Sequence, residues 1–191
     1  ARHLKRQGEQ VTNVVVMGMG EPFHNYDATL RAIDLLNHSE GFNLGARRFT
    51  ISTVGLIPMI RRFTAERRQV NLAISLHAAD DDLRASMLPV DRKYPLAALM
   101  DACVDYVEQT RRRVTFEWAL IRDVNDTVEQ AQKLAQLLQV FRQIKGQEGN
   151  FSALCHVNVI PLNPTQHYSG KATTHQRALA FQAELEKRGI P

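Results

Sequence analysis

The feature that most constrains the fold of this chain is a regular alternation between short apolar runs and longer amphipathic segments. Five runs have the length and β-branched composition of buried strands, namely 11–17, 48–53, 70–76, 114–121 and 154–160. Parallel strands require a crossover connection, which is usually a helix. Strands that are buried on both faces and separated by helices therefore predict an α/β fold with one parallel sheet.

The segments between these runs repeat apolar residues at helical spacing, as Leu96, Leu99, Met100 and Cys103 do. The predicted helices are 28–36, 56–66, 80–87, 96–107, 128–141 and 174–187, the last of them ending at Gly189. Both barrels and open sheets have this order of elements. Since a closed eight-stranded barrel needs ~250 residues, a chain of 191 residues predicts a single domain with about five strand–helix units of a partial barrel.

Composition excludes several classes of protein. No run approaches the ~20 apolar residues of a membrane span, and no apolar segment of a signal peptide follows the charged residues at the start of the chain. The two cysteines, Cys103 and Cys155, are too few for a disulfide framework, a structural zinc site or an iron–sulfur cluster. They predict buried, inert thiols and a cytoplasmic location.

The net charge of +4 comes with clusters of arginine at 47–48, 61–62, 67–68 and 111–113. If the clusters shared one face, they would form a nucleic-acid footprint. Cations at helix C-termini are the simpler interpretation of the charge alone.

Ligands of parallel α/β folds bind at the carboxyl ends of the strands, so the residues that follow each apolar run are the candidates for a site. Gly18, Gly20 and Glu21 follow the first run. Two glycines allow a ligand to approach the backbone closely, although they also suit a tight turn. Glu21 is able to receive a cationic amine or to cap a helix.

Further polar candidates end the later strands. Ser52 and Ser75 supply hydroxyls for a carboxylate or a ribose, or cap helices. His77 suits a base, a donor or a structural role, and Asn163 is a ligand contact or a turn residue between two prolines. Glu117 interrupts an apolar strand, so it is either inward and functional or paired with an arginine.

Five motifs in order then resemble one family. They are VVVMGMGEPFHNYD, RRFTISTVG, AISLHAADDDLR with LPVDRKYP, FEWALIRDVND and NVIPLNP. From about Val14 onward the chain resembles the radical S-adenosylmethionine methyltransferases that modify an adenine of large-subunit ribosomal RNA at C2, or at C8 in antibiotic-resistance relatives. The resemblance implies a partial (β/α)6 barrel that binds S-adenosylmethionine at its carboxyl-terminal mouth.

The resemblance also implies cofactor contacts, residue by residue. The matched positions are Gly20 and Glu21 of the GEP stretch, Ser52 of the STxG segment, Ser75, Leu76 and His77 of the SLH segment, and Asn163 of the NP loop. The family's three cluster cysteines, its catalytic glutamate and its methyl-accepting cysteine have no match in this chain. We therefore expect no catalytic residue and no metal ligand here, and a segment truncated at both ends that is inactive alone.

For the full-length enzyme, the resemblance implies a [4Fe–4S] cluster, an external electron donor and a ribosomal RNA substrate, with transfer RNA left open as a second one. A monomer that does not bind membranes is expected. Two other functions stay open from the residues: a non-catalytic RNA-binding domain and a barrel enzyme acting on a phosphorylated metabolite. The second would need a glycine-rich phosphate loop, whereas 162–164 is Leu-Asn-Pro.

Overall fold

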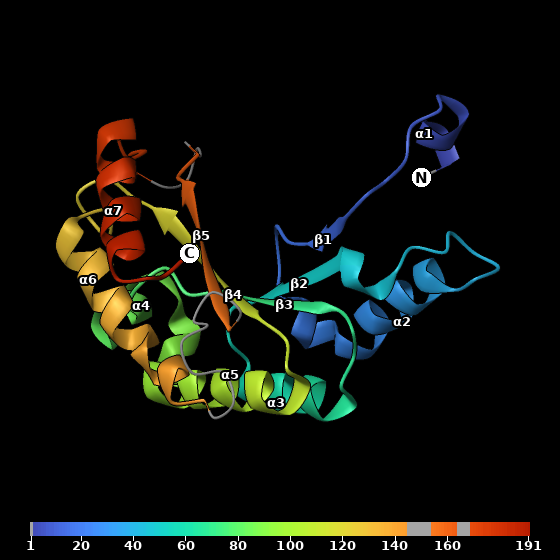
Figure 1. Cartoon of the computed structure of the whole chain (residues 1–191), viewed down its shortest axis with the longest axis horizontal. Coiled ribbons are helices and arrows are strands. Elements are labelled where there is room, and N and C mark those ends of the chain that lie inside the picture. Colours follow the sequence, from blue (N-terminus) through green and yellow to red (C-terminus); the bar gives the residue numbers. More distant parts are fainter. Residues whose placement is uncertain (1, 145–153, 164–168) are drawn as a thin grey trace.

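The computed structural model describes residues 2–144, 154–163 and 169–191, and it contains one parallel sheet with the sequential order β1-β2-β3-β4-β5 (Figure 1). The strands are β1 (Val14–Val16), β2 (Phe49–Thr53), β3 (Asn71–Ser75), β4 (Val114–Leu120) and β5 (Cys155–Pro161). Strands that follow one another in space as they do in sequence belong to a barrel, because an open doubly wound sheet reverses its order at a switch point. The predicted α/β fold, a partial parallel barrel, is confirmed.

The helices occupy the predicted segments with small shifts at their ends. The α-helices are α1 (Arg2–Arg6), α2 (Tyr26–Asn37), α3 (Ile57–Glu66), α4 (Asp81–Met87), α5 (Leu96–Thr110), α6 (Val128–Leu137) and α7 (His175–Lys187). The 3-10 helices are η1 (Pro22–Asn25), η2 (Ala46–Arg48), η3 (Pro89–Arg92) and η4 (Leu138–Gln143). The predicted helix 128–141 is thus divided into α6 and η4, while Asp80 caps α4 by accepting a hydrogen bond from Leu83 N.

Side chains of opposite character alternate along the strands. On one face of β2 to β4 lie large apolar residues, among them Phe49, Ile51, Leu72, Phe116 and Trp118, none of which is exposed to solvent. Helices α3, α5, α6 and α7 surround this side of the curved sheet (Figure 1). The core therefore lies between the convex face of the sheet and the helices.

The opposite, concave face carries small and polar residues such as Thr50, Ser52, Ser75, Thr115 and Glu117. No described helix covers it, and several of its side chains are half-buried. The expectation that the strands are buried on both faces therefore holds only in part for this face: Ser52, Ala73 and Glu117 are buried, whereas Thr50, Ser75 and Thr115 are half-buried. The half-buried positions result from the two-residue period of a strand, which turns every second side chain away from the helices.

Within the described parts of the chain, no helix combines the length and the apolar character needed to cross a lipid bilayer. The loop 145–150, which the sequence predicts to be flexible, lies outside the described residues, as does Pro164.

Candidate functional site

The carboxyl ends of the strands surround a cavity of about 450 Å³. Gly20 and Glu21 reach it from the loop after β1, Ser52 from β2, and Ser75 and His77 from the end of β3. Five of the seven predicted site residues thus line one cavity. Parallel strands place their carboxyl ends at a single edge of the sheet, which explains how residues so distant in sequence meet.

The other two predicted residues lie elsewhere. Leu76 has no exposed surface and belongs to the core, although its carbonyl accepts a hydrogen bond from Arg84 Nε at 3.2 Å. Asn163 is exposed just beyond β5 and is not among the cavity-lining residues. The structure therefore brings together five of the candidates from the first three strands and leaves Asn163 outside the cavity lining.

The loop after β1 requires its glycines for conformation. Gly18 and Gly20 have φ values of 117° and 95°, which residues with a Cβ adopt only with strain. Between them, Met19 is fully exposed beside the cavity. The two glycines thus shape a loop that presents backbone rather than side chains to a ligand.

Glu21 connects two of the strand-end loops. Its Oε1 accepts a hydrogen bond from Phe23 N at 2.9 Å and so caps η1, while its Oε2 accepts one from Val54 N at 2.7 Å. The helix-capping alternative is therefore present. Since a carboxylate has about four lone-pair sites, Glu21 retains acceptor capacity for a cationic group in the cavity.

The hydroxyls of Ser52 and Ser75 lie 3.2 Å apart and share a hydrogen bond. Beyond them His77 adopts a left-handed conformation with φ 61°. Its Nδ1 accepts a hydrogen bond from Ala119 N at 3.0 Å, so the neutral ring carries its proton on Nε2. Burial, with a smaller contribution from Arg84, lowers the pKa of His77 to about 4. At neutral pH His77 is consequently a fixed, uncharged hydrogen-bond donor.

Glu117 is a cavity residue whose role the sequence left open. It is only 5% exposed, and its Oε2 accepts a hydrogen bond from Asn158 Nδ2 at 2.8 Å. Among the described residues it forms no ion pair, so the arginine-paired alternative does not hold for this part of the chain. Burial raises the pKa of this carboxyl. Ser75, Glu117 and Asn158 occupy one register row across β3, β4 and β5.

Two buried polar side chains that sequence reasoning missed tie the strand-end loops together. Arg84 donates from Nη2 to Val54 O at 2.7 Å and from Nε to Leu76 O. Asn125 donates from Nδ2 to His77 O at 2.8 Å and accepts at Oδ1 from Ile121 N at 2.7 Å. The sequence offers no signal for either residue, because Arg84 closely follows three aspartates and Asn125 lies in the polar segment RDVND. Together with Glu21, they link the loops after β1, β2, β3 and β4 in series.

The described residues do not supply the ligands of a metal cluster. No three His, Cys, Asp or Glu side chains gather as a metal site anywhere in residues 2–144, 154–163 and 169–191. Cys103 and Cys155 are free and buried. Burial raises the pKa of both thiols, that of Cys155 to about 12, whereas a ligand to iron must be a thiolate. These residues do not fit an iron–sulfur cluster.

The sequence of this chain is similar to those of curated RNA methyltransferases. No family model matches the chain. It is 49% identical over 180 residues to a probable dual-specificity RNA methyltransferase RlmN of Roseiflexus castenholzii, covering 94% of this chain and 44% of that protein. It is 46% identical over 190 residues to dual-specificity RNA methyltransferase RlmN 1 of Myxococcus xanthus, covering 100% and 50%. The chain therefore spans about half the length of the curated relatives it matches.

Solved structures of other proteins are similar to this chain as well. A radical SAM methyltransferase from Sphaerobacter thermophilus superposes with a TM-score of 0.89 at 49% identity, covering 100% of this chain and 52% of that one. A domain of the pyruvate-formate lyase-activating enzyme from Bacteroides vulgatus has a TM-score of 0.61 at 15% identity. The second likeness concerns the fold alone, and it extends the partial barrel to a more distant enzyme.

Proposed function

We propose, on the premise that this chain belongs to the radical S-adenosylmethionine RNA methyltransferases as a segment of about half their length, that it forms the wall of the barrel that binds S-adenosylmethionine. The observation that carries the proposal is the cavity of about 450 Å³ shared by Gly20, Glu21, Ser52, Ser75 and His77. Ligand pockets commonly have volumes of about 300–1,000 Å³, so the cavity is large enough for a nucleoside-sized ligand.

The chemistry of the lining residues fits the parts of this ligand. The Ser52 and Ser75 hydroxyls and the Nε2–H of His77 are donors for a carboxylate or for ribose oxygens. Glu21 and Glu117 are acceptors for an ammonium group or for ribose hydroxyls. Asn163, which is exposed and does not line the cavity, remains a proposed contact to S-adenosylmethionine. When bound, S-adenosylmethionine supplies the methyl group that such an enzyme transfers.

The contribution of this chain to catalysis would be to hold the ligand in a fixed orientation. The side chains of Glu21, Arg84 and Asn125 hold the strand-end loops through backbone groups, which fixes donors and acceptors before a ligand arrives. The described residues supply neither cluster thiolates nor a reactive cysteine, so we propose that the chain is inactive alone. Ribosomal RNA is the proposed substrate of the whole enzyme, with transfer RNA as a second one, and an external reductant supplies its electrons.

The buried free cysteines support a reducing, cytoplasmic setting. We propose in addition that residues 1–191 act as one domain, since one core cluster joins α2, α3, α5, α6 and α7 to all five strands. A monomer is proposed as well.

Titration of ¹⁵N-labelled chain with S-adenosylmethionine, followed by NMR, tests the proposed site even at millimolar affinity. The amide signals of Gly20, Ser52, Ser75 and His77 should shift together, while that of Arg61 on α3 should not. S-adenosylhomocysteine serves as the matched ligand without the methyl group. Absence of shifts at the four site residues at millimolar ligand would overturn the proposal and favour the non-catalytic alternative.

A further inference from the structure

A second polar cavity, also of about 450 Å³, lies at the amino-terminal ends of the strands, opposite the candidate site. Four arginines line it, Arg47 and Arg111 to Arg113, and none of the described residues that line it is a carboxylate. Thr50, Asn71 and Thr115 complete the wall with two hydroxyls and an amide. Every one of these groups is able to donate a hydrogen bond to an anion.

The topology explains why these residues meet. Arg47 belongs to η2, which leads directly into β2, and the arginines 111–113 form the turn between α5 and β4. Arg111 ends α5 in a left-handed conformation with φ 55°. Because β3 lies between β2 and β4, Arg47 and the arginines 111–113 come together beside Asn71, the first residue of β3. Two of the arginine clusters in the sequence thus become one surface.

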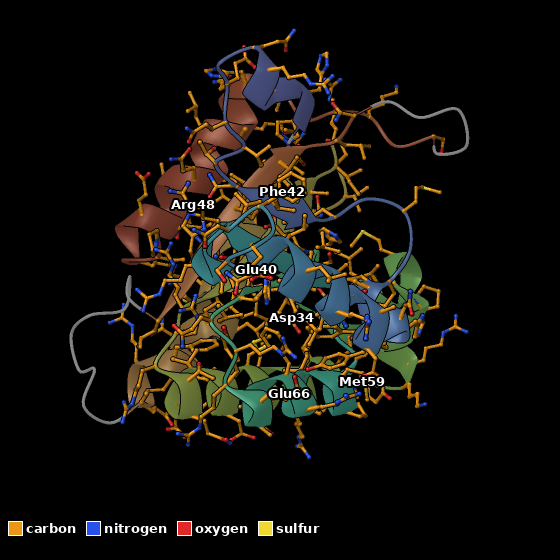
Figure 2. All side chains as sticks on the ribbon, turned by 90° about the vertical axis from the view of Figure 1, so that its right-hand side faces the viewer. Asp34, Glu40, Phe42, Arg48, Met59 and Glu66 are labelled. Atoms are coloured by element: carbon orange, nitrogen blue, oxygen red, sulfur yellow. The ribbon has the colours of Figure 1, made fainter. Side chains whose placement is uncertain are left out.

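Carboxylates balance the charge of some arginines outside this cavity, while others, such as Arg48, Arg61 and Arg67, form no ion pair within the described residues. Five other arginines form ion pairs with carboxylates: Arg62, Arg68, Arg84, Arg177 and Arg188. Figure 2 shows one such region, where Asp34 of α2 and Glu66 of α3 lie near each other, and Arg68 pairs with both.

Two of the cavity arginines, Arg47 and Arg112, are held by neutral groups. Arg112 donates from Nη1 to Gln69 Oε1 at 3.2 Å and from Nη2 to Asn71 Oδ1 at 2.5 Å, and Arg47 donates to the same Gln69 oxygen at 3.4 Å. No described carboxylate forms an ion pair with Arg47, Arg112 or Arg113. Amide oxygens fix the position of a guanidinium without neutralising it, so the positive charge remains available to a ligand.

We propose that this cavity binds a phosphate group. Arginine guanidinium groups match phosphate oxygens in geometry and charge, and the flanking threonine and asparagine side chains add neutral donors. Resting on the proposed function, the expected source of the phosphate is an RNA backbone; free inorganic phosphate is the other source of the same chemistry. Thr50 and Ser52 lie two residues apart on the concave face of β2, about 7 Å along the strand, and each lines one of the two cavities.

Fluorescence anisotropy of a labelled single-stranded RNA of mixed sequence, titrated with the 191-residue chain, tests the proposal. The double variant Arg47→Gln/Arg113→Gln removes two charges at the cavity, and Arg61→Gln/Arg67→Gln removes the same charge from exposed residues outside it. We expect the first variant to lose about tenfold in affinity and to lower the salt dependence of log K by about one to two. The control variant should stay within about twofold of the parent chain.

Inorganic phosphate provides the second arm. Its addition to ¹⁵N-labelled chain should shift the amides of Thr50, Asn71 and Thr115 if the free ion is the ligand. If RNA binds through these arginines and phosphate shifts nothing, the backbone of RNA is the source. Equal losses in both double variants, or no binding of either probe, would overturn the proposal.

The S-adenosylmethionine titration separates this proposal from the proposed function. The cavity variant should keep the cofactor-induced shifts of Ser52 and Ser75, which also shows that it is folded. Should the double variant fail to fold, Arg113→Gln alone, which changes one exposed side chain, carries the test. A chain that binds RNA through Arg47 and Arg113 but never binds S-adenosylmethionine would refute the proposed function and leave the phosphate site intact.

Discussion

Arg84 and Asp91 form an ion pair that is sealed from solvent: Nη1 lies 2.6 Å from Oδ1, and the two side chains are 0% and 1% exposed. The same guanidinium donates to the carbonyls of Val54 and Leu76. One side chain thereby joins η3 to the loops after β2 and β3, directly beneath the candidate site.

Replacing Arg84 by methionine should be strongly destabilising, because Asp91 would remain buried without its cation. Loss of one partner from a buried pair costs about 3–5 kcal/mol in unfolding free energy, which urea titration measures. Arg188→Met is the matched control, since its pair with Glu184 is exposed on the arginine side and should be worth less than about 1 kcal/mol. A similar, small loss for both variants would refute this role of Arg84.

The half-buried His77 should make the chain less stable in mild acid. Its pKa is about 4 in the fold and about 6.5 when unfolded, so between these values only the unfolded chain takes up the proton. Stability therefore rises with pH through this window, by about 1–2 kcal/mol between pH 5 and pH 7 from this residue.

His77→Asn is the variant that isolates this effect, because asparagine tolerates the left-handed backbone and retains an acceptor for Ala119 N. Urea unfolding at pH 5, 6 and 7 should show a flatter pH dependence for the variant. An unchanged slope would mean that another group causes the acid sensitivity.

Glu117 should make binding of S-adenosylmethionine dependent on pH. The carboxylate form of Glu117 accepts hydrogen bonds more strongly than the protonated form does. Burial raises the pKa of the group. Affinity should therefore increase as the pH rises through this raised pKa and then level off. Calorimetric or NMR titrations from pH 5 to pH 8 measure it, and Glu117→Gln should be both weaker and flatter. Persistence of the full pH dependence in the variant would assign it to another residue.

Ser75 and Asn163 offer a comparison between a residue that lines the cavity and an exposed residue that does not. If both contact the ligand, alanine at either position should weaken binding about two- to tenfold, the range of one hydrogen bond. Asn163→Ala should leave the unfolding free energy within about 0.5 kcal/mol, because the side chain is exposed. Unchanged affinity in Asn163→Ala would remove this residue from the proposed site.

The order of strands and helices could be predicted because it depends on local properties. Apolar periodicity marks α5 from Leu96 onward, and the run of aspartates beginning at Asp80 marks the start of α4. The burial of the strands was predicted less well, since small residues such as Ser52 and Ala73 fit both a covered and an open face. In β4, Thr115 and Glu117 alternate with Val114, Phe116 and Trp118, which marks the concave face in the sequence, although Glu117 is itself buried.

The connections between loops could not be predicted from the chain alone. Arg84 bonds to a carbonyl 30 residues away and Asn125 to one 48 residues away, and backbone acceptors leave no trace in the residue types of the partner. Asn163 is the opposite case: its motif assigns it to the site, whereas in the structure it does not line the cavity. Residue identity indicates chemistry, and the position of a loop depends on contacts that only the fold supplies.

The two faces of the sheet have a consequence for how such a chain can change over evolution. In β4 the odd positions Thr115 and Glu117 look onto the concave side, while Phe116 and Trp118 anchor the helices. Substitutions at neighbouring positions thus fall under separate selection, one for folding and one for ligand choice. A strand of this kind can acquire a new binding preference without rebuilding the interior that keeps it folded.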